Sequence, residues 1–278
     1  MLKVGMVTRS LYGYSVTECA RKMEEFGFSS TEFCFTFEDM KMWVYNGITD
    51  LSSVTKEWAE QSAKEFRDRG IEIVSVGAFT NPNEADPEMF EEVCLCFESF
   101  CRIASWMKVP FVSTETGFVQ GKRGINTDTY ETDFSRFVSN MKRLCKIAAE
   151  YGVSVAFEPC MLDLTPSAKR TRDFIAFVDE PNLKILLDPA NLIHNSDEED
   201  MFRYLGSHLA YIHGKDRTLT DTYGRNLGEG VIDWVKFFKL YHEYAEGVPV
   251  ILEYVNAENC CEVKERAISF NEKAEENL

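Results

Sequence analysis

The chain alternates short apolar runs with longer amphipathic segments, and this alternation repeats eight times. The apolar runs are rich in Val, Ile and Phe, which is typical of parallel strands buried on both faces. We predict strands at residues 3–8, 30–35, 71–79, 110–114, 153–158, 183–188, 209–214 and 248–254. The segments between them have helical spacing and predict helices at residues 16–26, 55–69, 89–107, 148–151, 173–178, 198–205, 234–245 and 262–273.

Local end signals support several of these helices. Gly27, Gly70 and Gly152 each follow a predicted helix at the position where glycine commonly ends one. The sequence Asp86-Pro87 supplies a capping residue and then a proline at the first helical position.

Eight strands, each followed by a helix, predict an α/β fold. Parallel strands need such crossover connections, and eight repeats in about 250 residues match a (β/α)8 TIM barrel. The main rival, a doubly wound sheet, usually has a glycine-rich turn after its first strand, and residues 8–13 contain no such turn. No linker-like stretch or change of composition divides the chain, so we expect one domain over residues 1–278.

Two connections are longer than the barrel requires, at residues 36–53 and 116–129. Both follow the carboxyl end of a strand, so both would overhang the active-site face of a barrel. Long loops in compact domains are often lids, but an ordinary surface insertion explains them equally well.

Composition narrows the class of protein further. Of the 278 residues, 45 % are hydrophobic and 27 % are charged, a globular balance that excludes disorder. The net charge of −16 disfavours nucleic-acid binding. We expect no membrane span, because no apolar run approaches about 18 residues. An odd set of nine cysteines without framework spacing, and no signal-peptide segment, predict reduced thiols in a cytoplasmic protein.

Four consecutive predicted strands each end on a carboxylate or an imidazole. These residues are Glu158, Asp188, His213 and Glu253. Closing the barrel would bring them to one mouth, where buried carboxylates are costly unless they are paired, protonated or bound to a cation. Three carboxylates and one histidine suit one divalent ion such as Mn, Co, Zn or Mg. The alternative is that each acid caps the helix that follows it.

Longer motifs surround these four residues. They read Phe157-Glu158-Pro159, Leu187-Asp188-Pro189-Ala190-Asn191, Ile212-His213-Gly214-Lys215-Asp216, and Gly228-Glu229-Gly230-Val231-Ile232-Asp233-Trp234. The succession resembles the sugar phosphate isomerase/epimerase group, the xylose isomerase-like TIM barrel superfamily. That superfamily also contains ketose 3-epimerases, inosose dehydratases and endonuclease IV. The resemblance covers the whole chain in strand order and is densest at residues 153–254.

The resemblance implies a metal site formed by Glu158, Asp188, His213 and Glu253, with Glu158 and Glu253 as the acid/base pair. The ketose epimerases of the group carry a histidine three residues after the metal-binding aspartate, whereas this chain has Asn191. Asn191 could bind a substrate hydroxyl but would shuttle a proton less readily, so the resemblance does not identify the substrate.

Further polar residues follow the strand ends and are candidates for substrate contacts. Lys215 and Arg217 could bind substrate hydroxyls or a phosphate, or be solvated loop charges. Glu115 would face the mouth, Asp216 could orient His213 or Arg217, and Glu229 could close the substrate loop. We expect Asp233 to cap a helix, and His194, His208 and His242 not to be metal ligands, with His242 on the surface.

Taken together, these features predict a metal-dependent isomerase or epimerase of a small sugar or sugar phosphate. Proton removal next to a ketose carbonyl would pass through an enediolate. The alternatives are an inosose-type dehydratase with the same ligands and a non-catalytic sugar-binding barrel. A repair endonuclease would need more than four histidines and a less acidic chain. Members of the superfamily are often dimers or tetramers, which leaves a homo-oligomer open.

Overall fold

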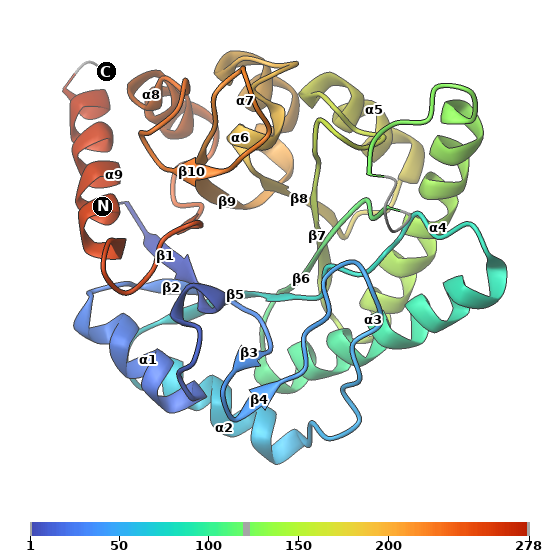
Figure 1. Cartoon of the computed structure of the whole chain (residues 1–278), viewed down its shortest axis with the longest axis horizontal. Helices are drawn as coiled ribbons and strands as arrows, with labels where there is room; N and C mark the ends of the chain where they lie inside the picture. The colour runs from blue at the N-terminus through green and yellow to red at the C-terminus, as the bar shows by residue number, and fades with distance from the viewer. Residues whose placement is uncertain (1, 119–122, 277–278) are drawn as a thin grey trace.

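Eight parallel strands pair side to side around a closed ring in the computed structural model, which describes residues 2–118 and 123–276. The last strand pairs with the first, which closes the barrel (Figure 1). In ring order the strands are β1 (Val4–Val7), β2 (Ser30–Phe33), β5 (Glu72–Gly77), β6 (Phe111–Glu115), β7 (Ser154–Glu158), β8 (Leu183–Leu187), β9 (Leu209–Asp216) and β11 (Val250–Leu252). The predicted (β/α)8 barrel in one domain is confirmed.

Helices surround the barrel and connect successive strands (Figure 1). They are α1 (Val16–Glu25), α2 (Lys56–Arg67), α3 (Pro87–Met107), α4 (Tyr130–Glu150), α5 (Ala168–Val178), α6 (Pro189–Leu192), α7 (Glu198–Leu205), α8 (Trp234–Tyr244) and α9 (Cys260–Glu275). Both α6 and α7 lie between β8 and β9 along the chain. None of the helices in the described ranges is long and apolar enough to cross a membrane.

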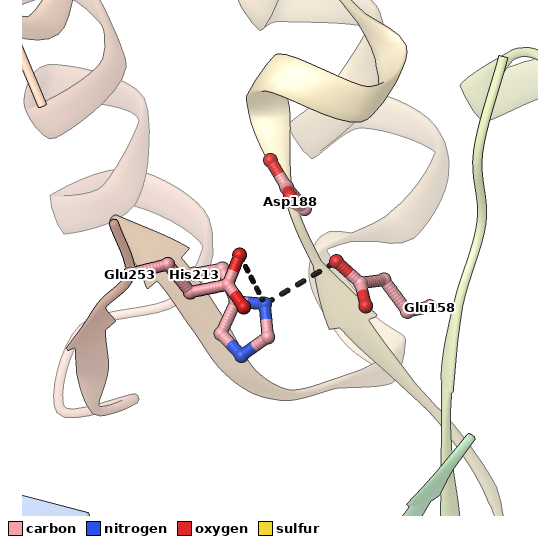
Figure 2. Close-up of side chains that lie close together, drawn as sticks. All are labelled: Glu158, Asp188, His213 and Glu253. Carbon is pink, nitrogen blue, oxygen red and sulfur yellow. Dashed lines mark hydrogen bonds and ion pairs between the residues drawn. The ribbon is translucent and has the colours of Figure 1, made fainter. Parts of the chain in front are cut away.

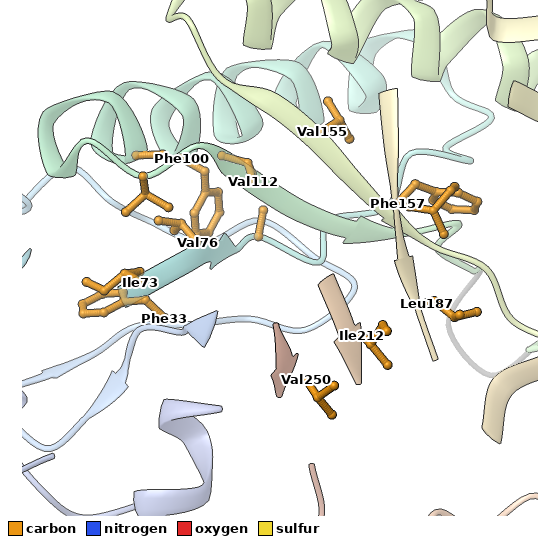
Figure 3. Close-up of a cluster of buried hydrophobic side chains, with 14 of the residues drawn as sticks. Phe33, Ile73, Val76, Phe100, Val112, Val155, Phe157, Leu187, Ile212 and Val250 are labelled. Atoms are coloured by element: carbon orange, nitrogen blue, oxygen red, sulfur yellow. The ribbon is translucent and has the colours of Figure 1, made fainter. Parts of the chain in front are cut away.

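Alternating side chains of each strand separate the core into two parts. One set points outward and packs beneath the helices, as Val155, Phe157 and Ile212 do in Figure 3. The other set fills the barrel interior and includes Ala156, Leu186, Tyr211 and Ile251. Because the side-chain period of a strand is two, the residues two positions further on also point inward. Those residues are Glu158, Asp188, His213 and Glu253.

Several elements differ from the sequence prediction in extent. Helix α4 begins at Tyr130, whereas only its last turn was predicted, and α5 begins five residues earlier than predicted. The loop at 36–53 contains a short hairpin of β3 (Thr36–Phe37) and β4 (Met40–Lys41), and β10 (Arg225–Asn226) adds an antiparallel pair to β9. All nine cysteines are free, and eight of them are buried.

Candidate metal centre and active site

Four buried side chains converge at the carboxyl ends of consecutive strands. Glu158 ends β7, Asp188 follows β8, His213 lies within β9, and Glu253 follows β11. One potential ligand atom from each lies within 4.8 Å of the others, and all four residues are buried (Figure 2). The strand pairing explains the convergence, since adjacent parallel strands end at the same rim of the barrel.

The imidazole of His213 is held from both ring nitrogens. Its Nδ1 lies 3.2 Å from Glu158 Oε1 and 3.5 Å from Glu253 Oε2, so the two carboxylates flank the ring (Figure 2). Its Nε2 lies 3.2 Å from Glu32 Oε2, inside the barrel. Glu32 is fully buried and also accepts a hydrogen bond from the hydroxyl of Tyr211. With Nε2 donating to Glu32, Nδ1 is the nitrogen free to bind an ion.

The charges of this cluster shift one another's proton affinity. Burial lowers the pKa of His213, but the carboxylates of Glu158 and Glu32 outweigh it and raise the pKa to about 9. Burial likewise raises the pKa of Glu158, yet His213 and Lys215 prevail and lower it to about 2. Without a metal ion, the cluster is therefore stabilised by a protonated imidazole.

Asp188 has two roles at the start of α6. Its Oδ1 accepts a hydrogen bond of 3.2 Å from the backbone N–H of Asn191, so it caps that one-turn helix. Its Oδ2 is buried without a hydrogen-bond partner and lies against the ammonium group of Lys215. The capping alternative is thus correct for Asp188, but it uses only one of the two carboxylate oxygens.

The donor set fits a divalent cation. Three buried carboxylates and one imidazole offer the mixed oxygen and nitrogen ligands that Mn, Co and Zn accept. The Lys215 ammonium balances part of the acidic charge, 3.0 Å from Glu253 Oε2 as well as against Asp188. An ion held by Glu158, Asp188, His213 and Glu253 would supply the remaining positive charge and bind the open oxygen of Asp188.

A pocket of about 600 Å³ opens above the cluster. Glu158, Glu253 and Lys215 form part of its lining, and the two long loops contribute Trp43, Tyr45 and Arg123. Both loops therefore overhang the mouth as predicted, although residues 119–122 of the second loop lie outside the described residues.

Glu115, at the end of β6, faces the same pocket. It accepts a 2.7 Å hydrogen bond from the Tyr45 hydroxyl and lies 3.3 Å from Arg123. Burial and the charge of Glu158 raise the pKa of this carboxyl group. Glu115 thus joins the two loops across the mouth.

Asn191 bridges two other predicted site residues. Its amide nitrogen donates to Glu158 Oε1 at 3.0 Å, and its Oδ1 accepts from Arg217 Nη2 at 3.1 Å. Arg217 also faces the pocket. The amide therefore orients Glu158 and links it to the guanidinium of Arg217.

Asp216 does not orient His213, contrary to one of the two roles predicted for it. Its carboxylate accepts hydrogen bonds from the backbone N–H groups of Arg217, Gly228 and Ile232 and from the indole of Trp234. The chain at Gly230 passes so close that a Cβ there would lie 2.0 Å from Asp216 Oδ1. Asp216 thus organises the loop after β9, and Glu32 contacts the imidazole instead.

Residues 20–276 match the xylose isomerase-like TIM barrel family. The chain belongs to this family. A curated relative, 3-dehydroshikimate dehydratase of Bacillus anthracis, is 25 % identical over 187 residues, which are 66 % of this chain. The chain spans 64 % of that relative's length.

Solved structures share the fold along almost the whole chain. A D-tagatose 3-epimerase-like protein has a TM-score of 0.81 at 16 % identity and covers 99 % of both chains. The IolI protein with a bound zinc atom has a TM-score of 0.76 at 16 % identity, covering 98 % of this chain and 99 % of its own. At these identities the likeness shows the fold alone.

The remaining predicted residues lie away from the pocket. Glu229 is exposed and pairs with Arg266 at 3.3 Å, so it does not line the mouth. Asp233 caps α8, as predicted, by accepting from the backbone N–H of Lys236. His242 is only partly exposed where a surface position was expected, because its side chain is 13 % exposed and lies 3.0 Å from Asn271 on α9.

Sequence reasoning missed two charged residues of the site. Glu32 contacts His213, and Arg9 pairs with both Glu253 and Glu32. The sequence does contain a signal for both residues. Glu32 is an acid within a predicted apolar strand, and Arg9 is a cation that directly follows another predicted strand. Glu32 lies inside the predicted strand at residues 30–35 and not at its end, so a search restricted to strand ends did not find it.

Proposed function

We propose that the protein is a divalent-metal-dependent enzyme that moves a proton next to the carbonyl group of a small sugar or sugar phosphate, as an isomerase or epimerase. The observation that carries the proposal is the pair of carboxylates of Glu158 and Glu253, which flank His213 at the floor of the pocket. The epimerase-like neighbour supports the same class of reaction only through the shared fold.

Glu158, Asp188, His213 and Glu253 would hold the ion, one of Mn, Co, Zn or Mg. When bound, such an ion polarises the substrate carbonyl and an adjacent hydroxyl and so stabilises an enediolate. Asn191 keeps Glu158 in place through its 3.0 Å hydrogen bond, and Arg9 and Lys215 do the same for Glu253.

The two glutamates transfer the proton. A carboxylate on one face of the substrate removes it from the carbon beside the carbonyl, and a carboxylic acid on the other face returns one, which inverts that centre. If one glutamate instead carries the proton between two adjacent carbons, the carbonyl moves and the reaction is an isomerisation. Both outcomes use the same residues.

A dehydratase is the second candidate, supported by the curated relative at 25 % identity. It would begin with the same proton removal, after which the hydroxyl group of the next carbon would leave as water and a carbon–carbon double bond would form. The Lys215 ammonium, 3.0 Å from Glu253, is the group that could protonate this leaving hydroxyl.

Turnover in D2O tests the proposal. A panel of ketoses and ketose phosphates is incubated with Mn2+ and the protein and followed by NMR. We expect deuterium at a carbon next to the carbonyl, with exchange slowed at least 100-fold in Glu253→Gln, because a general acid/base residue contributes about 10²–10⁴-fold to the rate.

The exposed Glu258→Gln, five residues further along the chain, is the matched control and should exchange like the wild type. Loss of a hydroxyl from the product would favour the dehydratase. Absence of exchange with every compound, while the metal is bound, would contradict both enzymes and favour a sugar-binding barrel.

A further inference from the structure

Arg217 is a buried cation without a counter-ion. The residue is 5 % exposed and follows directly after β9. Its Nη2 donates to the Asn191 amide oxygen at 3.1 Å, and its Nη1 donates to the sulfur of Met161 at 3.5 Å. Its Nε is buried with no hydrogen-bond partner. Within residues 2–118 and 123–276, no carboxylate lies within ion-pair distance of this guanidinium.

Each of the other cations that line the pocket among the described residues is paired with an acid. Arg9 pairs with Glu253 and Glu32, Lys215 with Asp188 and Glu253, and Arg123 with Glu115 at 3.3 Å. Burying a charge without a partner costs several kcal/mol, so an unpaired cation here is destabilising in the free protein. The neighbouring Asp216 makes no ion pair with the guanidinium, because its carboxylate accepts from backbone N–H groups and an indole instead.

We propose that Arg217 binds a carboxylate group of the substrate, so that the substrate is a sugar acid or a related hydroxylated keto acid. The inference rests on the proposed function and narrows its substrate class. A guanidinium presents N–H groups in a planar fork that matches the two oxygens of a carboxylate. The contact with Met161 can be replaced, because a thioether is a weak acceptor.

A carboxylate fits this position better than a phosphate. Arg217 contributes one positive charge, and the nearby cations are already paired with acids of the site. A phosphate dianion would bring a second negative charge close to Glu158, which Asn191 links to the guanidinium. A single-charge carboxylate balances Arg217 without a further cation.

Asn191 also sets the distance between the anion-binding guanidinium of Arg217 and the proton-transfer carboxylate of Glu158. Its amide group spans from Arg217 to Glu158, so an anion on the guanidinium lies about one amide group away from a proton-transfer carboxylate. A single small molecule in the 600 Å³ pocket can therefore reach both.

Calorimetric binding to the Mn2+-loaded protein tests the inference with three ketohexose probes that differ at C6. These are D-fructose, D-fructose 6-phosphate and D-fructuronate, supplemented by a panel of other hydroxylated keto acids. We expect a carboxylate to bind at least about ten-fold tighter than its neutral or phosphorylated counterpart. Arg217→Met should weaken that binding roughly 10- to 100-fold, the usual loss for hydrogen bonds to a charged group, and Arg217→Lys should weaken it less.

Exposed Arg203→Met is the matched control and should bind like the wild type. Because its guanidinium has no counter-ion, we expect Arg217→Met to unfold at a temperature no lower than that of the wild type. Tighter binding of a phosphate or a neutral sugar, unchanged carboxylate binding by Arg217→Met, or binding of no carboxylate in the panel would each overturn the inference. Binding is a separate readout from deuterium exchange, so a carboxylate that binds through Arg217 without exchange would contradict the proposed function alone.

Discussion

The position and the protonation state of each residue in this site depend on the charged side chains that it contacts. His213 illustrates the point, since Glu32 holds one ring nitrogen while Glu158 and Glu253 flank the other. The acids raise the pKa of the imidazole to about 9, so it carries a proton at neutral pH when no metal ion is bound. A metal ion needs the neutral ring, and its binding must therefore release this proton.

We predict that the apparent affinity for Mn2+ rises roughly ten-fold per pH unit between pH 6 and pH 8. The sign follows from the raised pKa of His213, because the fraction of neutral imidazole grows ten-fold per unit at any pH below about 9. Calorimetry in buffers of different ionisation enthalpy measures both the affinity and the released proton.

Glu32→Gln provides the comparison for this prediction. It keeps the shape of the side chain but removes a carboxylate that raises the pKa of His213. Proton release at pH 7.5 should then decrease. An affinity that is independent of pH from 6 to 8 in the wild type, with no proton released, would contradict this view of the histidine.

Among the elements, the loop between β9 and α8 depends on one side chain. The carboxylate of Asp216 accepts hydrogen bonds from Arg217, Gly228, Ile232 and Trp234, and so fixes this loop to the barrel. Arg217 begins the loop, so its position in the pocket depends on the same contacts.

We predict that Asp216→Asn lowers the free energy of unfolding by about 2–4 kcal/mol. The amide group would turn an N–H toward buried donors, and each donor left without a partner costs about 1–3 kcal/mol. Asp233→Asn is the control, because asparagine caps helices as well as aspartate does and should change stability by less than about 0.5 kcal/mol. Urea unfolding compares the two, and equal stabilities would show that the loop does not depend on the Asp216 carboxylate.

The helix ends differ in how clearly the local sequence marks them. Helix α4 has no capping side chain at its start, whereas Gly152 follows its end with a φ of +69°. Only the end was therefore predictable. The first turns of α5 are mostly polar, which hid its start at Ala168, although Ser167 caps it.

At the scale of the whole molecule, the barrel joins residues that are far apart in the sequence. The hydroxyl of Tyr211 reaches Glu32, 179 positions away, and Arg9 reaches Glu253. Strand ends can be predicted from apolar runs, and with them the convergence of Glu158, Asp188, His213 and Glu253. Which charges pair across the interior depends on the closed ring, so the partners of Arg9 and Glu32 could not be predicted.

We propose that these four side chains together form one divalent metal site. The most direct test is elemental analysis and pulsed electron paramagnetic resonance of the protein, first stripped with a chelator and then titrated with Mn2+. We predict one Mn2+ per chain, coupled to one imidazole nitrogen, with the coupling lost in His213→Ala and the affinity reduced in Asp188→Asn. A wild-type protein that binds no Mn2+ tightly, or binds it without a coupled nitrogen, would show that the four side chains do not form such a site.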